Sequence, residues 1–191
     1  MSIREIMLDL DNAIVHSMTR KEYDSYIANN WRSGHPSPAR VGHFRVFERP
    51  NLDLFLSELF RDYDVSVWSM GTKEYVDDIV DHVFARRGLK PKRVLTRGDC
   101  NRSTRTRKQP KAVAAGSVLI DDRFANVYNQ RDRALLIPSF DMDDYVIDGD
   151  HTLPHVLKTL SRRRLQSKKE GGGKADCLTM NLVRHMRRSS S

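Results

Sequence analysis

Two pairs of aspartates in this sequence stand where short apolar segments end. Asp9 and Asp11 follow an apolar segment at the N-terminus, and Asp121 and Asp122 follow a second one at 117–120. Carboxylates gathered in one place repel one another unless a hard cation neutralises them, and Mg²⁺ prefers oxygen ligands. A carboxylate is also a nucleophile that can form an acyl-phosphate. These residue types fit a magnesium site for phosphoryl transfer, although Asp-x-Asp is also common in solvated turns and Asp-Asp in helix caps.

Apolar segments alternate with helical patterns along the chain, which predicts parallel strands with helices on the faces of the sheet. Ligands of such sheets bind beyond the carboxyl ends of the strands. Ser69, which directly follows one apolar segment, is therefore expected beside the aspartates. The spacing of apolar residues predicts amphipathic helices over 52–63, 75–84 and 153–160. We expect core strands at 3–10, 64–68, 93–96, 117–120 and 134–137, a short strand at 43–48, and a long polar excursion over 18–42.

The positive charge of the chain is concentrated near its C-terminus. The 191 residues carry a formal net charge of +8, of which residues 162–191 supply +7. This basic segment also contains Gly171-Gly172-Gly173 and ends in serines, a composition that resists packing. We therefore expect one domain over residues 1–160 and a basic, flexible tail over residues 161–191 that binds nucleic acid or an acidic partner.

Composition also excludes some classes of protein. The longest apolar stretch, 112–120, is far shorter than the roughly 20 residues that a membrane helix needs. Cys100 and Cys177 are the only cysteines, so the sequence carries no disulfide framework. We expect an intracellular protein, in the nucleus or the cytoplasm, with no membrane partner.

Five segments carry a resemblance to one known family. Residues Asp9 to Ser17 read DLDNAIVHS, which is similar to the signature DLDxTLVHS. Four further segments follow in chain order. Arg49-Pro50 with Leu52 and Phe55-Leu56 is similar to RPxLxxFL, and the segment 67–75 is similar to VFTASTKEYAD. The segment 95–100 is similar to LxRxxC, and the segment 118–122 is similar to VIIVDDSP. The chain thus resembles the haloacid-dehalogenase phosphatases that act on the RNA polymerase II C-terminal repeat, also called NLI-interacting-factor-like. The resemblance implies an α/β, HAD-like (Rossmannoid) parallel sheet flanked by helices, with a small insert after the second core strand.

The resemblance also implies roles for the acidic residues. Asp9 is the expected nucleophile and a metal ligand, and Asp11 is the expected acid/base, with its backbone carbonyl on the metal. Asp122 resembles the third metal ligand. Asp121, beside it, is grouped with the metal site and is also the expected partner of a lysine. The implied cofactor is Mg²⁺.

Phosphate and substrate contacts follow from the same resemblance. Ser69 stands in place of the family's usual Thr and is expected to hold the phosphoryl oxygens together with Lys108. Lys108 is preferred to Lys111 because its distance from the LxRxxC segment matches the family more closely. Arg97 lies in the segment that the family uses near its phosphopeptide, and Arg123 replaces the motif Ser as a further substrate contact.

The predicted function is that of a magnesium-dependent phosphatase that works through an aspartyl-phosphate intermediate. Its expected substrate is phosphoserine or phosphothreonine of a protein such as the RNA polymerase II C-terminal repeat. Two departures bear on this prediction: Ala13 replaces the motif Thr, and 101–111 lacks the aromatics of the family's insert. Two alternatives stay open: a polynucleotide or nucleotide phosphatase of the same fold, favoured by the basic run 97–111, and an inactive scaffold that binds through the tail.

Overall fold

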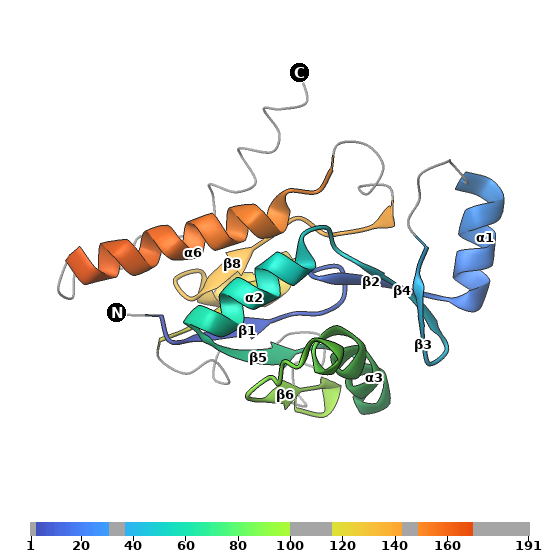
Figure 1. The fold of residues 1–191 in the computed structure, drawn as a ribbon, viewed down its shortest axis with the longest axis horizontal. Helices are drawn as coiled ribbons and strands as arrows, with labels where there is room; N and C mark the ends of the chain where they lie inside the picture. The colour runs from blue at the N-terminus through green and yellow to red at the C-terminus, as the bar shows by residue number, and fades with distance from the viewer. Residues whose placement is uncertain (1–2, 31–36, 100–115, 143–148, 170–191) are drawn as a thin grey trace, which may run out of the picture.

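The computed structural model describes residues 3–30, 37–99, 116–142 and 149–169, which form a mixed α/β fold (Figure 1). Its centre is a five-stranded parallel sheet with the strand order β6-β5-β1-β7-β8. These strands are β1 (Glu5–Leu8), β5 (Asp64–Trp68), β6 (Val94–Leu95), β7 (Ser117–Asp121) and β8 (Ala134–Leu136). Each overlaps one of the five segments predicted as core strands, so the predicted parallel α/β fold is confirmed.

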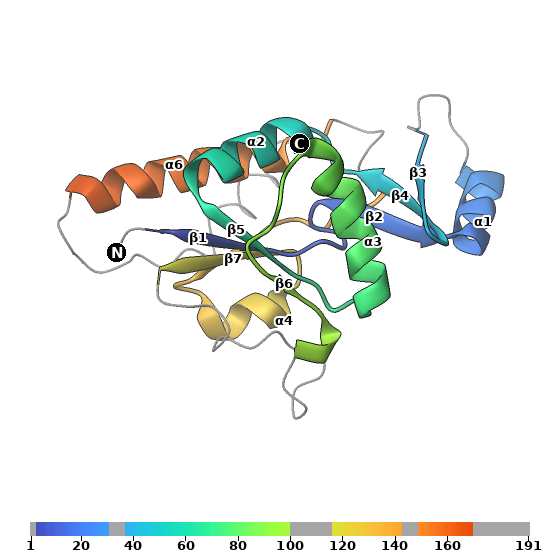
Figure 2. The same ribbon diagram turned by 60° about the horizontal axis from the view of Figure 1, so that its bottom comes forward.

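Helices cover both faces of this sheet. Alternate residues of β1 face opposite sides, as the pleat of a strand requires. Ile6 and Leu8 pack in the core shared with α2 (Leu52–Asp62), α3 (Lys73–Val83) and α6 (Thr152–Lys169). Met7 packs on the other face, with Val127 of α4 (Phe124–Val127) (Figure 2). Short 3₁₀ turns follow α3, β6 and α4: η1 (Ala85–Arg87), η2 (Arg97–Asp99) and η5 (Tyr128–Gln130).

A second, antiparallel sheet is inserted between β1 and α2. Its strand order is β2-β4-β3, with β2 (Val15–Thr19), β3 (Ala39–Val41) and β4 (Phe44–Glu48), and α1 (Arg20–Asn30) follows β2. This unit projects beyond one end of the main sheet (Figure 1). The sequence predicted a short strand at 43–48, which β4 confirms, but over 18–42 it predicted only a long polar excursion. Regular structure forms there because Tyr23 and Tyr26 of α1 pack against the buried side chains Phe47 and Phe140.

The small insert expected from the sequence stays a prediction. The sequence predicted a small insert after the second core strand, and the segment that it assigned to this insert falls within 100–115, outside the described residues. The insertion that the structure does describe, β2 to β4, follows the first core strand, β1.

Hydrogen bonds to the side chain of Glu5 link the three central strands, β5, β1 and β7. Its buried carboxylate accepts hydrogen bonds from Ser66 of β5 and Ser117 of β7, each 2.7 Å long, and from Arg93 at 2.7 and 2.9 Å. Burial alone would raise the pKa of Glu5, but the hydrogen bonds from Ser66, Arg93 and Ser117 outweigh it and hold the pKa below its ordinary value. The strand registers place Glu5 opposite Asp64 and Ser117, so the carboxyl ends of β1, β5 and β7 meet at one edge.

Glu5→Gln is expected to lower the free energy of unfolding by about 2–4 kcal/mol, because it removes the charge from a buried hydrogen-bonded group. The lowered pKa also predicts a pH dependence. The stability supplied by Glu5 is present above the ordinary glutamate pKa and is lost as the pH falls through the lowered one. Urea unfolding at several pH values measures both effects, and the variant should lose this part of the acid sensitivity.

Asp64→Asn serves as the control for Glu5→Gln. The Asp64 carboxylate is 57% exposed and pairs with Lys92 at 2.7 Å on the surface. Its loss should therefore cost less than about 1 kcal/mol. An equal cost for the two variants would contradict the role given to Glu5.

Helix α6 continues past the predicted end of the domain. It begins at Thr152 and extends to Lys169, whereas the sequence placed the boundary after Leu160. Its N-terminal part is buried through Leu153, Val156 and Leu160, and further along Arg164 pairs with Asp62 of α2 at 3.0 Å. Across the described segments, every helix is too short or too polar to span a bilayer.

We propose that the domain needs only the buried part of α6. Truncation after Leu160 removes the surface ion pair of Arg164, but it removes no fully buried apolar side chain of the described part of α6. It should therefore lower the free energy of unfolding by less than about 1 kcal/mol. Truncation after Lys169 should leave the urea midpoint unchanged. If the chain that ends at Leu160 loses cooperative unfolding and the chain that ends at Lys169 keeps it, the C-terminal boundary of the domain lies closer to Lys169.

Candidate active site

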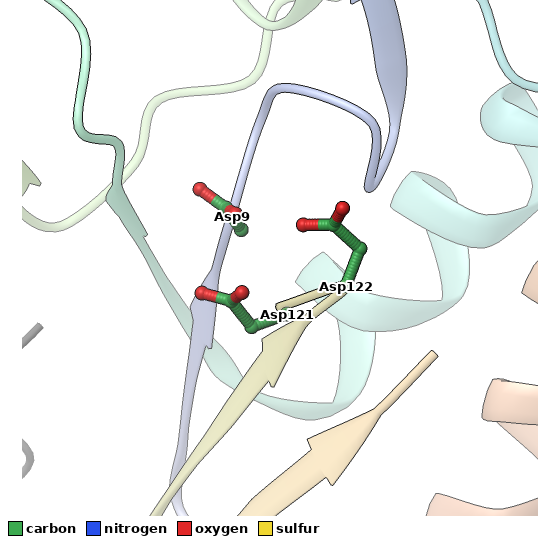
Figure 3. A group of neighbouring side chains, drawn as sticks. All are labelled: Asp9, Asp121 and Asp122. Carbon is green, nitrogen blue, oxygen red and sulfur yellow. The ribbon is translucent and has the colours of Figure 1, made fainter. Parts of the chain in front are cut away.

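Three aspartates converge at the carboxyl edge of the main sheet. Asp9 follows β1, whereas Asp121 ends β7 and Asp122 follows it, and each offers an oxygen within 4.8 Å of the other two. Figure 3 shows the three side chains around one space between the ends of the two strands. Asp9 is 4% exposed and Asp121 is fully buried, so water screens their charges poorly. Such a set of oxygen ligands fits a hard divalent cation.

Neutral donors orient the later pair of aspartates. Asp121 accepts a 2.8 Å hydrogen bond from the backbone N–H of Arg123 and two 3.0 Å bonds from the side-chain amide of Asn126. Asp122 accepts a 3.1 Å bond from the Ser139 hydroxyl. Because Asn126 belongs to α4 and is buried, this helix fixes the position of Asp121.

A tight turn carries the chain from Asp9 to β2. The carbonyl of Leu10 accepts bonds from the backbone N–H groups of residues 13, 14 and 15 at 3.0–3.2 Å. Asn12 adopts a left-handed conformation with φ of 57°, which Asn tolerates better than most residues, and its side-chain oxygen lies 2.9 Å from Nδ1 of His16. The turn separates the Asp11 side chain from the cluster formed by Asp9, Asp121 and Asp122.

Hydroxyl groups hold Asp11 in place. Oδ2 accepts a 3.2 Å bond from Ser69, and Oδ1 accepts a short bond from the Tyr75 hydroxyl, which also lies 2.8 Å from the hydroxyl of Ser17. Burial raises the pKa of Tyr75 above its ordinary value, and the negative charge of Asp11 adds to this effect. Tyr75 therefore stays protonated and remains a donor. The two oxygens of Asp11 thus accept hydrogen bonds from Ser69, directly after β5, and from Tyr75 of α3.

The turn after β5 brings Ser69 and Arg97 together. The backbone N–H of Gly71 donates to the Ser69 hydroxyl at 3.0 Å, and Ser69 is fully buried. The Arg97 Nε–H donates to the Met70 carbonyl at 2.8 Å, while the Arg97 side chain stays exposed. Gly71 leaves room for Tyr75, because a Cβ at this position would lie 2.5 Å from the ring. The backbone after β5 therefore places Ser69, Tyr75 and Arg97 around one turn.

Those residues singled out from the sequence that the structure describes divide into three groups. Asp9, Asp121 and Asp122 form one cluster, whereas Asp11 and Ser69 bond to each other beside it. Arg97 and Arg123 are exposed on the turns after β6 and β7. Lys108 lies outside the described residues, so its predicted role stays a prediction. Sequence reasoning missed the roles of Tyr75, Ser17 and Asn126, although Ser17 and Tyr75 lie in segments that match the motifs of the family.

Comparison with known proteins finds one matching family and several similar proteins. Residues 5–170 match the model of the family described as NLI interacting factor-like phosphatase. The putative CTD phosphatase-like protein 355R of Invertebrate iridescent virus 3 is 26% identical over 178 residues, which cover 81% of this chain and 94% of the viral protein. The nuclear envelope morphology protein 1 of Saccharomyces cerevisiae is 29% identical over 84 residues, or 41% of this chain and 18% of the yeast protein.

A solved structure shares the fold. It is a variant of the fission yeast RNA polymerase II CTD phosphatase Fcp1 with beryllium fluoride bound. It matches with a TM-score of 0.53 and 17% identity, over 88% of this chain and 52% of that one. The chain thus spans about half the length of this structure and less than a fifth of the yeast nuclear envelope protein.

Proposed function

Because the chain belongs to the NLI interacting factor-like phosphatase family, we propose that it is a magnesium-dependent phosphatase that works through an aspartyl-phosphate on Asp9. The observation that carries this proposal is the convergence of Asp9, Asp121 and Asp122 within 4.8 Å, at the strand edge where Asp11 and Ser69 also lie. One carboxylate is available to attack phosphorus, and a second, held apart from the cluster, is available to move the proton.

The acidic cluster fits Mg²⁺ on chemical grounds. Its ligands are all carboxylate oxygens, which Mg²⁺ prefers, and two of the three aspartates are buried, so the cluster gains from a compensating positive charge. Asp9, Asp121 and Asp122 would hold the ion together with the backbone carbonyl of Asp11. Bound Mg²⁺ would neutralise these carboxylates and polarise the phosphoryl oxygens.

The two carboxylates of the DLD segment divide the chemistry. An oxygen of Asp9 attacks phosphorus while the bond from phosphorus to the leaving oxygen breaks, and Asp11 gives that oxygen a proton. Water then attacks the phosphorus of the aspartyl-phosphate, and Asp11 takes the proton of the water. Inorganic phosphate leaves and the Asp9 carboxylate is restored. Ser69 would turn its hydroxyl from Asp11 to a phosphoryl oxygen, and Lys108 would bind a second one.

For the substrate, we propose phosphoserine or phosphothreonine in a protein segment such as the RNA polymerase II C-terminal repeat. The names of the viral relative and of the fission yeast structure support this class. Arg97 and Arg123, both exposed beside the site, suit the phosphate because a guanidinium can bind two oxygens at once. Such a substrate agrees with the expected nuclear or cytoplasmic location.

Asp9→Asn should lower the turnover of an aryl phosphate on the order of 10⁴-fold, since it removes the nucleophile. The wild type should require Mg²⁺, and mass spectrometry of a trapped intermediate should place the phosphoryl group on Asp9. Asp132→Asn is the matched control, because its side chain is 62% exposed on the surface, and this variant should retain full activity. Near-full turnover by Asp9→Asn, or a phosphoryl group on Ser69, would contradict the mechanism.

Tyr75→Phe should reduce the hydrolysis of an alkyl phosphate about tenfold more than that of an aryl phosphate. The variant loses the hydroxyl that holds Asp11, and an alkoxide needs the proton from Asp11 far more than a phenolate does. The ratio of kcat/KM for the two substrates measures the effect. Phe44→Leu is the control: it disturbs the edge-on ring contact with Tyr75 at 4.9 Å and keeps the hydroxyl, so the ratio should stay unchanged. An equal loss on both substrates in Tyr75→Phe would show a purely structural role.

A further inference from the structure

Two exposed aromatic side chains lie on α4 and on the 3₁₀ turn η5 that follows it, next to the acidic cluster. Phe124 is 53% exposed and Tyr128 is 51% exposed, and their ring centres are 5.3 Å apart. The guanidinium of Arg131 lies 4.2 Å from the centre of the Tyr128 ring and 5.8 Å from that of Phe124. Phe124, Tyr128 and Arg131 are called the aromatic patch below. Single exposed apolar residues are ordinary, but grouped aromatics with an arginine are enriched where proteins bind partners.

The aromatic patch has a fixed position relative to the acidic cluster. On its inner side, α4 holds Asp121 through Asn126 and packs Val127 in the core. On its outer side, the same turn presents Phe124 and Tyr128, four residues apart and therefore on one side of the helix. Figure 2 shows α4 on the face of the sheet opposite to α2 and α6. A molecule that contacts the aromatic patch therefore lies on the α4 face, next to the end of β7.

Charge favours an anionic partner for the aromatic patch. Several surface arginines in the described segments are paired with acids: Arg61 with Glu58, Arg86 and Arg87 with Glu48, and Arg164 with Asp62. No such ion pair of Arg123 or Arg131 occurs within the described residues. Both flank the aromatic rings, so this side of the site combines positive charge with apolar surface.

The angle between the rings favours a peptide over nucleic acid. Successive bases of a single strand stack on aromatic faces, which suits rings that lie flat to the strand. Phe124 and Tyr128 are tilted by 52° to each other, and Arg131 already lies over the face of Tyr128. A tilted pair offers an edge and a face to one inserted ring, as aromatic-lined surfaces do for proline-rich peptides.

We propose that the aromatic patch docks an extended phosphopeptide that carries a proline or an aromatic side chain close to the phosphorylated residue. The proposal rests on the proposed function for the reaction itself, and adds a second point of contact that selects the sequence around the phosphate. Phe124 and Tyr128 receive the ring of the peptide, while Arg131 attracts a neighbouring anionic group.

The test compares the double variant Phe124→Ser/Tyr128→Ser with Leu54→Ser. Leu54 is 55% exposed on α2, so its substitution removes a similar exposed apolar residue on the other face of the sheet. For a phosphoserine peptide with adjacent proline and tyrosine, the double variant should lose about tenfold in kcat/KM, mainly through KM. Its aryl phosphate turnover should stay within about twofold, and Leu54→Ser should leave both unchanged. A second peptide, with alanine in place of proline and tyrosine, should bind the wild type and the double variant equally.

Fluorescence anisotropy of the labelled peptides, with each change also made in the Asp9→Asn background, measures docking without turnover. Absence of aryl phosphate hydrolysis by the wild type would contradict the proposed function alone, because the anisotropy still tests the aromatic patch. Equal binding of the proline-tyrosine peptide to the double variant and to its parent would overturn the docking proposal. So would a loss confined to a 5′-phosphorylated oligonucleotide, which would assign the rings to base stacking.

Discussion

The buried carboxylate of Glu5 accepts hydrogen bonds from both neighbours of the central strand, Ser66 on β5 and Ser117 on β7. Because side chains alternate along a strand, a slip of one residue would turn its apolar residues to the wrong face. The same slip would move one strand end by about 3.3 Å relative to the next. Asp9 and Asp121 share a cluster only because their strands end level with each other. The polar contacts at one end of the sheet therefore determine whether the carboxylates meet at the other.

Arg49 fixes the turn that follows Asp9. Its buried guanidinium pairs with Asp150 and donates to the carbonyl of Ala13 at 2.8 Å and to the hydroxyl of Thr152 at 3.0 Å. A buried charge is costly unless it is paired and its donors are satisfied, and these contacts meet that condition. Ala13 lacks the hydroxyl that the family motif has at this position, yet its backbone is held from outside the turn. The Arg49 contacts also tie the start of α6 to the turn that carries Asp11.

Periodicity predicted the parts of this structure in which apolar residues repeat. The helices α2, α3 and α6 follow from such a repeat. The five core strands follow from short apolar segments, and the aspartates stand where two of these segments end. The segment 18–42 gave no such signal, because α1 is held by Tyr23 and Tyr26 within a polar sequence. Tyr75 counted as a core residue because its ring fits the apolar stripe of α3. Its hydroxyl meets Asp11 only through the fold, so a partner 64 positions away could not be inferred from spacing.

The inserted sheet contacts Tyr75, whose hydroxyl donates a hydrogen bond to Asp11. Ser17 of β2 lies 2.8 Å from the Tyr75 hydroxyl, and Phe44 of β4 packs edge-on against the Tyr75 ring. The elements that hold Asp9 and Asp121 belong to the main sheet, whereas those that hold Asp11 include the insertion. The nucleophile and the proton-transfer group are thus supported by different parts of the fold. Changes in the insertion can therefore alter the orientation of Asp11 while the acidic cluster, which depends on β1, β7 and α4, stays in place.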